Sequence, residues 1–374
     1  MGLIGLYIHV PFCARKCPYC DFYSLPADDD LKDAYFNRVV NLLNSERQVA
    51  DQVAFDTVYL GGGTPSQLGT ERLVRLLKVV QQTCAVQPEA EITLECNPSD
   101  VPALDCAALH RTGYNRVSLG LQSAADAERV TLGRRGSAQD VTNALHSLRR
   151  ARLDNISLDM MLGVPGQTPD SLRKTLAFAV QADVQHISAY LLKIEPGTPF
   201  ATRKFNEIAD DDAQADMYHL ACEYLEKHGF LQYEISNFAL PGYESRHNLK
   251  YWHCEEYWGL GPGAHSFLGG RRFYISRNLD EFISSSKLID DGPGGSLEEY
   301  AMLALRLNEG LREDKVRSRF AHSIPQKMRR AAENLERHGL VITDDDGIRL
   351  TQQGFLLSNG IIGQIVTTLD NLSG

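Results

Sequence analysis

Short apolar runs alternate with longer amphipathic segments through the first half of the chain. The apolar runs cover residues 6–10, 56–60, 91–95, 116–120, 155–160 and 186–191. Helical spacing of apolar positions marks the segments between them, at 30–49, 70–83, 101–111, 138–151 and 169–182. Strands and helices in this regular alternation predict an α/β fold whose parallel sheet is joined by right-handed crossovers. Six units are fewer than the eight of a closed (β/α)8 barrel, and the period alone also allows a doubly wound open sheet.

Polar residues and glycines gather where these runs end. They are Cys13, Cys17 and Cys20 after the first run, residues 61–65 (Gly-Gly-Gly-Thr-Pro) after the second, and Glu95, Gln122 and Asp159 at or near the ends of the next three. The carboxyl ends of parallel strands meet at one edge of a sheet or barrel, where such folds place their functional groups. The sequence therefore predicts a functional site at this edge.

The second half of the chain changes character. A helical pattern at 211–228 precedes an aromatic and histidine-rich stretch at 233–273, which contains both tryptophans. Residues 284–296 have the Ser, Gly, Pro and Asp content of a linker. We therefore divide the chain into a barrel core at 1–230, a His/aromatic segment with its linker at 231–290, and a C-terminal domain at 291–374.

The C-terminal region predicts a small α+β domain. Helical patterns at 297–311, 314–320 and 325–338 precede short strand patterns at 340–342 and 348–350, an order typical of a winged-helix-like unit. Residues 297–374 contain 10 basic and 11 acidic side chains, 10 − 11 = −1. A unit without excess positive charge is not expected to bind DNA.

Composition and charge mainly exclude classes of protein. The chain has 374 residues, of which 43% are hydrophobic and 23% charged, as in soluble globular proteins with a substantial core. A net charge of −10 argues against a nucleic-acid partner held by phosphate neutralisation. The apolar runs are shorter than a membrane span, and the N-terminus lacks the basic region of a signal peptide. We therefore expect a cytoplasmic protein.

Three of the eight cysteines lie together as Cys13-x3-Cys17-x2-Cys20. An iron–sulfur cluster normally takes four cysteines, so three from one loop would leave one iron open to another ligand. A structural zinc site closes with four ligands, and here His9, Asp21 or a distant cysteine would have to complete it. Three unrelated buried cysteines are a further alternative that spacing alone leaves open.

The residues around the three cysteines read YIHVPFC-x3-CPYCDF across positions 7–22. This segment resembles the cluster loop of the radical SAM superfamily, in its coproporphyrinogen-oxidase-like branch. The resemblance implies a [4Fe–4S] cluster on Cys13, Cys17 and Cys20, whose open iron is chelated by S-adenosylmethionine. It also implies an incomplete (β/α)6 TIM-like barrel, which agrees with the six units above.

The same resemblance implies which residues hold the cofactor. Tyr7, Gly62 and Glu95 match contacts to the cluster-bound S-adenosylmethionine. A second group matches positions that hold a second S-adenosylmethionine in coproporphyrinogen dehydrogenases, namely Gly63, Thr64, Gln122, Arg134 and Asp159. Alternatives are a solvated strand-end carboxylate at Glu95 and a purely structural pair between Arg134 and Asp159.

A second motif reads HNLKYW at 247–252. Imidazole is a common axial ligand of haem iron, and aromatic rings provide an apolar wall for a porphyrin, although a histidine beside Tyr and Trp is more often a core residue. The H-N-x-x-Y-W pattern is similar to a signature of the haem chaperone branch. That likeness implies haem contact by His247, with Asn248, Tyr251 and Trp252 around it. We expect the other candidates in this stretch to be structural: His253, Cys254 and His265.

Two departures separate this chain from the dehydrogenases it resembles. Phe22 stands where those enzymes carry a further cysteine, and the cluster motif begins at Cys13 without their N-terminal extension. We therefore expect a haem chaperone with a radical SAM core that lacks coproporphyrinogen dehydrogenase activity. The alternatives are an oxygen-independent coproporphyrinogen III dehydrogenase, which decarboxylates propionates through a 5′-deoxyadenosyl radical, and a zinc-stabilised α/β protein.

The resemblance also implies partners. The ligand would be haem, and the recipients would be haem-requiring proteins, respiratory ones among them. Because such recipients can be membrane-bound, peripheral membrane association is compatible with this chain. Family resemblance also allows a homodimer.

Overall fold

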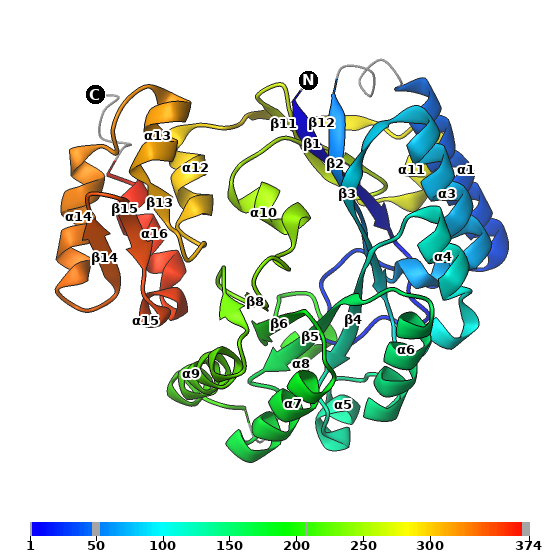
Figure 1. Ribbon diagram of the computed structural model, residues 1–374, viewed down its shortest axis with the longest axis horizontal. Helices are drawn as coiled ribbons and strands as arrows, with labels where there is room; N and C mark the ends of the chain where they lie inside the picture. Colours follow the sequence, from blue (N-terminus) through cyan, green and yellow to red (C-terminus); the bar gives the residue numbers. More distant parts are fainter. Residues whose placement is uncertain (1, 47–52, 206–207, 369–374) are drawn as a thin grey trace.

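The computed structural model describes residues 2–46, 53–205 and 208–368 (Figure 1). All six predicted strands are present, and each pairs in parallel with the next in chain order. They are β1 (Leu3–Val10), β2 (Ala54–Gly62), β3 (Ala85–Cys96), β4 (Arg116–Gln122), β5 (Asn155–Leu162) and β6 (His186–Leu191). The sheet runs on beyond β1 and β6 without joining its two edges, so the barrel is incomplete, as predicted.

Helices cover the outside of this curved sheet (Figure 1). The longer ones are α1 (Asp29–Ser45), α3 (Gly69–Thr83), α4 (Cys106–Thr112), α6 (Ala138–Arg150), α7 (Pro169–Gln181) and α9 (Asp211–Lys227). Short helices lie between them, namely the 3-10 helices η1 (Pro65–Leu68) and η2 (Val101–Ala103) and the α-helices α5 (Asp126–Thr131) and α8 (Pro199–Thr202). Side chains cap several of the longer helices, as Asp28 and Thr168 do for α1 and α7.

Two predicted helices of the barrel core differ in extent from the observed ones. The helix expected at 30–49 ends at Ser45, and positions 47–49 lie outside the described residues. The helix expected at 101–111 is divided into η2 and α4. Asp105 lies at the break, where its carboxylate accepts the backbone N–H of Ala108 and starts α4 afresh.

The segment after α9 extends the sheet at both edges. Beyond β6 lie β8 (Asn237–Ala239) and β7 (Leu231–Gln232), and beyond β1 lie β9 (Tyr257–Leu260), β10 (His265–Leu268), β11 (Arg271–Ile275) and β12 (Leu288–Pro293). Strand β9 runs parallel to β1, and β10 to β12 follow as antiparallel neighbours. Two short helices, α10 (Arg246–Trp252) and α11 (Leu279–Ser284), complete the segment.

The prediction of a linker at 284–296 is wrong for its central part, because residues 288–293 form β12. This strand pairs antiparallel with β11, with Ile275 opposite Leu288. Its Asp, Gly and Pro content is typical of loops, but an edge strand needs partners on one side only and tolerates such residues. Pairing with a neighbour therefore overrides local composition here.

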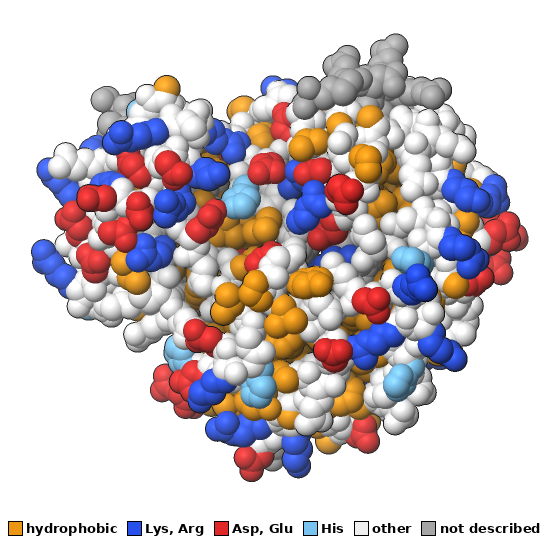
Figure 2. All heavy atoms as spheres, in the orientation of Figure 1, with side chains coloured by type: hydrophobic (Ala, Val, Ile, Leu, Met, Phe, Trp, Pro, Cys, Tyr) orange, Lys and Arg blue, Asp and Glu red, His pale blue; other side chains and the backbone are white. Residues whose placement is uncertain are grey.

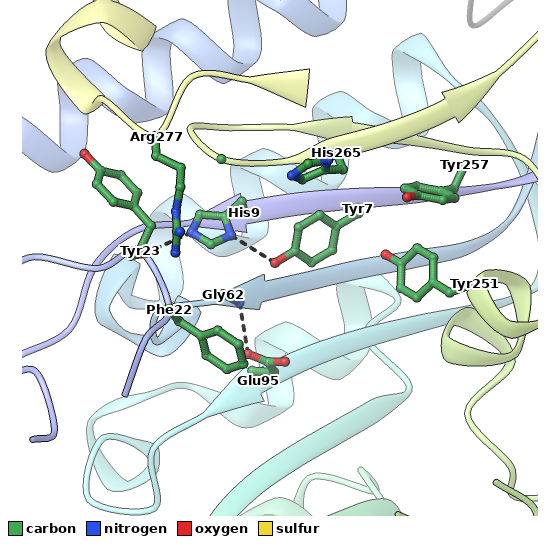
Figure 3. Close-up of a pocket in the computed structure, with 11 residues that line it drawn as sticks. Tyr7, His9, Phe22, Tyr23, Gly62, Glu95, Tyr251, Tyr257, His265 and Arg277 are labelled. Carbon is green, nitrogen blue, oxygen red and sulfur yellow. Dashed lines mark hydrogen bonds between the residues drawn. The ribbon is translucent and has the colours of Figure 1, made fainter. Parts of the chain in front are cut away.

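Apolar and polar side chains occupy opposite faces of the barrel strands. On β1, Leu6 and Ile8 are buried in the core shared with the outer helices, whereas Tyr7 points into the barrel (Figure 3). Polar groups on the inner face bond across neighbouring strands, as Ser118 Oγ does to Asp159 Oδ1 at 3.0 Å. The hydrophobic core therefore lies between sheet and helices, and the interior is polar.

The C-terminal unit forms its own group of helices and strands beside the barrel segment (Figure 1), and its buried apolar side chains are continuous with the core of the barrel. It contains α12 (Leu297–Ala304), β13 (Leu311–Arg312), α13 (Glu313–Phe320), α14 (Gln326–Glu336), β14 (Val341–Asp344), β15 (Gly347–Leu350), α15 (Gln352–Leu356) and α16 (Ser358–Val366). Its three strands form their own antiparallel sheet in the order β13-β15-β14. The helix expected at 297–311 ends at Ala304, and the chain beyond it pairs with the segment after α9, where Ile235 N–H donates to Arg306 O and Asn308 N–H donates to Tyr233 O, each at 3.0 Å.

Polar contacts join this unit to the barrel segment. Arg319 donates to the carbonyl oxygens of His253 (2.9 Å) and Cys254 (2.6 Å), and Glu309 Oε1 lies 2.8 Å from His253 Nε2. Figure 2 shows charged side chains of both signs over the C-terminal unit, and orange apolar groups around the hollow beside it. Among the described helices, none is long and apolar enough to cross a lipid bilayer.

Candidate cofactor site at the carboxyl ends of the strands

The three clustered cysteines lie on a loop that leaves the end of β1. Cys13, Cys17 and Cys20 are partly exposed, whereas the other five cysteines are buried. Backbone bonds fix the loop, since Cys13 N–H donates to Leu25 O (3.1 Å) and Leu25 N–H donates to Pro11 O (2.8 Å). Burial raises the pKa of the Cys20 thiol, with the neighbouring thiols Cys17 and Cys13 adding to the shift. The loop therefore brings three thiols near one another at the barrel mouth.

Hydrogen-bond donors surround this loop. Thr64 Oγ1 lies 3.2 Å from Cys13 Sγ, and Arg134 Nη1 lies 4.0 Å from Cys17 Sγ. A hydroxyl and a guanidinium beside thiolates suit an anionic, sulfur-ligated centre, because outer donors stabilise the charge on the ligands. In the described part of the chain, no three His, Cys, Asp or Glu side chains are placed to hold a single metal ion directly.

The glycine turn after β2 packs against the cysteine loop. Gly62 has φ 107°, and a Cβ there would meet the His9 ring at 2.4 Å. A Cβ on Gly63 would lie 2.8 Å from the carbonyl oxygens of Val10 and Phe12. Only glycine fits both positions, because the turn after β2 lies in close contact with the backbone at the end of β1.

Two hydrogen bonds of the His9 ring orient the Tyr7 side chain at the carboxyl ends of the strands. His9 Nε2 lies 3.0 Å from the carbonyl oxygen of Tyr23, which can only accept, so Nε2 carries the proton. His9 Nδ1 then accepts the hydroxyl proton of Tyr7 at 3.0 Å. Burial lowers the pKa of His9 to about 4, so the ring is neutral at pH 7. The Tyr7 oxygen therefore presents its lone pairs to a ligand.

Glu95 is held in place by two donors. The Tyr59 hydroxyl donates to Oε1 at 2.7 Å, and the Gly62 N–H donates to Oε2 at 3.1 Å. Burial nevertheless raises the pKa of this carboxyl to about 7. Glu95 is thus a positioned group inside the barrel rather than a freely solvated strand-end carboxylate.

The alternative of a structural pair between Arg134 and Asp159 is not found, because the described residues include no ion pair between them. Arg134 Nη2 donates instead to the carbonyl of Gly120 at 2.8 Å, and Asp159 accepts from Ser118. Burial raises the pKa of Asp159. Gln122 adopts φ 64° at a bulge in the β4–β5 register, which turns the end of β4 toward the mouth.

His247 lies inside the barrel on α10, with both ring nitrogens engaged. Nδ1 is 2.8 Å from Thr57 Oγ1, and Nε2 is 2.8 Å from the Tyr251 hydroxyl. The ring is 1% exposed and stacks on Tyr59 with centroids 5.1 Å apart. Burial lowers its pKa to about 3. His247 is therefore a neutral, enclosed imidazole that would have to break a hydrogen bond to bind a metal.

The other residues of the motif at 247–252 differ in their burial and in whether they reach the cavity. Asn248 and Trp252 are half-buried on α10, and the backbone N–H of Asn248 is 3.5 Å from its cap, Ser245 Oγ. Tyr251 reaches the cavity at the mouth. This tyrosine therefore links His247 to the space where a ligand would lie.

A cavity of about 490 Å³ opens between the strand ends and the segment that extends the sheet (Figure 3). Four predicted site residues line it, namely Tyr7, Gly62, Glu95 and Tyr251. The other lining residues were not predicted as site residues; they are His9, Phe22, Tyr23, Tyr257, Gly263, His265 and Arg277. His9 and Phe22 stand within the cysteine motif, which could have indicated them. Tyr257, His265 and Arg277 reach the cavity only because β9 pairs with β1, which local sequence does not reveal.

Comparison with known families matches both parts of the chain. Residues 7–179 match the radical SAM superfamily, and residues 296–357 match the HemN C-terminal domain. The solved structure of coproporphyrinogen III oxidase (HemN) from Escherichia coli superposes with a TM-score of 0.86 at 20% identity, covering 98% of this chain and 90% of that one. The α/β radical SAM fold and its C-terminal domain are therefore confirmed.

Relatives named heme chaperone HemW align along nearly the whole chain. The Bacillus subtilis protein is 32% identical, with 97% of this chain and 99% of the relative covered. That of Mycobacterium tuberculosis (strain H37Rv) is 36% identical over 96% and 93%, and that of Escherichia coli (strain K12) is 30% identical over 96% and 97%.

Proposed function

Because this chain belongs to the HemW family of the radical SAM superfamily, we propose that it is a haem chaperone that binds haem and delivers it to haem-requiring proteins. The observation that carries the proposal is full-length similarity to relatives of that name, combined with an aromatic-lined cavity next to the cysteine loop. An apolar-walled cavity with a few polar groups is the usual form of a site for a flat organic ligand.

Cys13, Cys17 and Cys20 would hold a [4Fe–4S] cluster, with S-adenosylmethionine on its open iron. Such a cluster supplies an electron to the sulfonium when both are bound. Thr64 and Arg134 would donate to the thiolates from outside. Tyr7, Gly62 and Glu95 would face the cofactor, since they line the cavity beside the loop.

Gly63, Gln122 and Asp159 complete the proposed cofactor set by shaping the wall. Gly63 holds the glycine turn against the cysteine loop, and Gln122 turns the end of β4 inward. Among the described residues, hydroxyl groups are the donors that contact the Asp159 carboxylate, which leaves it able to accept from a ligand amine.

Haem contact would involve α10, with Tyr251 at the cavity and His247 behind it. Asn248 and Trp252 would pack behind this face of the helix. The recipients would be haem proteins, including respiratory and membrane-associated ones, and delivery would take place from the cytoplasm. A homodimer would be one form in which the chain acts.

The test is haem binding and turnover by the full chain purified and reconstituted without oxygen. A brown protein with about four irons, a saturable Soret band on adding haem, and transfer of that haem to an apo-haemoprotein would support the proposal. Triple substitution of Cys13, Cys17 and Cys20 by Ser should remove the cluster absorption. A Cys84→Ser variant, which alters a buried cysteine outside the loop that carries Cys13, Cys17 and Cys20, serves as the matched control.

The outcome that contradicts the proposal is enzymatic. Incubation with coproporphyrinogen III, S-adenosylmethionine and a reductant should give no protoporphyrinogen. Steady turnover would instead identify a coproporphyrinogen dehydrogenase, and a colourless protein containing zinc would remove both functions.

A further inference from the structure

Two of the proposed cofactor residues stand on separate short segments beyond β4. Gln122 ends the strand itself, and Arg134 follows the short helix α5. Gln122 is the centre of a tight turn, because Ser123 N–H donates to Leu121 O at 2.9 Å and the φ of Gln122 is 64°. A residue other than glycine keeps this conformation only where its surroundings hold it there.

A buried guanidinium holds this turn. Arg129 lies on α5 with 2% of its surface exposed. Its Nη1 donates to Leu121 O at 2.5 Å and to Ser123 O at 3.1 Å, the two carbonyls that flank Gln122. One end of the guanidinium therefore binds the backbone on both sides of a proposed cofactor residue.

The other nitrogens of Arg129 bind the loop that carries Arg134. Nε donates to Gly136 O at 3.2 Å, and Nη2 donates to Arg135 O at 3.3 Å. The backbone N–H of Arg134 also donates to the carbonyl oxygen of Arg129 at 2.9 Å. One side chain therefore joins the two segments, and the forked donors of a planar guanidinium suit this task.

The loop after α5 packs on the cysteine loop. A Cβ on Gly133 would lie 2.8 Å from Pro18 Cδ, and Arg134 Nη1 is 4.0 Å from Cys17 Sγ. A displacement of this loop would therefore move a positive charge relative to the cysteine sulfurs.

Arg129 occupies an electrostatically unfavourable place. Among the described residues, no carboxylate forms an ion pair with its guanidinium, and burial lowers its pKa, with the positive charge of Arg134 adding to the shift. A buried cation without a carboxylate partner is destabilising, and an apolar side chain could fill the same space without that penalty. Packing alone therefore does not explain an arginine at this position, whereas the four bound carbonyls do.

We propose that Arg129 is a positioning residue of the cofactor site, which fixes Arg134 beside the cluster thiolates and Gln122 in the wall of the S-adenosylmethionine site. This inference rests on the proposed function, because it presumes that the cluster and its cofactor occupy the barrel mouth. Arg129 itself makes no contact with the cofactor and acts through the two segments that it joins.

The test compares Arg129→Gln and Arg129→Lys with the parent chain, each reconstituted without oxygen. Neither substitute can bind both segments at once, so each should weaken S-adenosylmethionine binding about tenfold, as measured by calorimetry. The reduction potential of the cluster should become more negative in both, because reduction adds negative charge and Arg134 would have moved from the thiolates. Potentiometric titration followed by electron paramagnetic resonance measures this shift.

Arg149→Gln is the matched control. Arg149 also donates to backbone carbonyls, those of Ala182 and Asp183, but these precede β6 at the opposite end of the barrel. Its loss should lower the melting temperature and leave cofactor affinity and cluster potential at the parent values. In the ligand-free chain, hydrogen exchange at residues 120–136 should increase in both Arg129 variants and stay unchanged in Arg149→Gln.

A double substitution tests whether Arg129 acts through Arg134. Arg129→Lys in an Arg134→Gln background should shift the cluster potential no further than Arg134→Gln alone. Additive shifts would contradict the inference.

The remaining outcomes separate this inference from the proposed function. If the parent chain assembles no cluster or binds no S-adenosylmethionine, the cofactor part of the proposed function fails and this inference with it. If the parent binds and either folded Arg129 variant matches it in affinity and potential, the assignment of Arg129 is wrong and the function stands. Failure of both variants to fold, judged by circular dichroism, would also overturn the assignment, since Arg129 would then support the whole fold rather than two segments.

Discussion

Burial determines what each histidine of this protein can do. The H-N-x-x-Y-W pattern drew attention to His247, but the sequence could not tell that Thr57 and Tyr251 occupy both nitrogens. His265 was expected to be structural, yet it lines the cavity. Residue type and spacing indicate chemistry, whereas the protonation and access of a side chain depend on neighbours that are distant in sequence.

Glu95 should make stability depend on pH. Its folded pKa of about 7 lies above the 4.5 of an unfolded glutamate, so the folded state binds the proton more tightly. This contribution is fully present below pH 4.5 and is lost as pH rises through 7. A shift of this size corresponds to ~3 kcal/mol. Urea unfolding of the ligand-free chain should show parent stability falling, relative to Glu95→Gln, between pH 5 and 7.5.

The control for this experiment is Glu71→Gln, which alters a carboxylate with 85% of its side chain exposed. Its stability should follow that of the parent at every pH. A Glu95→Gln variant whose stability also runs parallel to the parent would show that this carboxyl does not titrate in the interval.

At the scale of elements, regular alternation was enough to locate the six barrel strands. Each predicted run lies within the observed strand because it covers the mostly buried part, whereas β3 begins earlier, at Ala85, in an exposed stretch that the apolar pattern does not mark. Strands β9 to β12 were not predicted, since they are short and their pairing with β1 and with one another is non-local. The half of the cavity that depends on them was missed for the same reason.

The glycine turn should tolerate no side chain at its third position. In Gly63→Ala the new methyl group would lie 2.8 Å from two carbonyl oxygens of the β1 end. Because backbone cannot move aside as a flexible side chain does, we expect a loss of ~2 kcal/mol in stability and displacement of Thr64 from Cys13. Thermal unfolding and the yield of reconstituted cluster measure the two effects.

Gly360→Ala is the matched comparison, because this helical glycine of α16 has open space around it. It should raise stability by up to ~1 kcal/mol, as alanine favours a helix. Equal effects of the two substitutions would mean that the close packing at Gly63 does not constrain the turn.

For the whole molecule, the C-terminal unit is joined to the barrel segment by a shared apolar core, by backbone hydrogen bonds and by polar side-chain contacts. Arg319 spans the junction by donating to the carbonyls of His253 and Cys254, and its guanidinium lies 5.1 Å above the Tyr300 ring. These carbonyls directly follow α10, which carries the motif at 247–252. Movement of the unit would therefore displace α10, whose Tyr251 lines the cavity.

Arg319→Ala should loosen this junction without unfolding either part. Loss of two charged hydrogen bonds is expected to cost ~2 kcal/mol at the interface. Hydrogen exchange measured by mass spectrometry should increase at residues 246–256 and along α12, while the barrel strands stay protected. Arg330→Ala, an exposed arginine of α14, should leave exchange unchanged. Unaltered protection in Arg319→Ala would assign the docking to other contacts.

The polar lining of the barrel has an evolutionary consequence. Because the apolar layer that secures the fold lies outside the strands, substitutions on their inner face exchange one hydrophilic group for another and leave that layer intact. Such a scaffold can acquire a new cargo or abandon an old reaction through a handful of replacements. Descendants of one ancestor can then diverge in chemistry while their backbones stay superimposable.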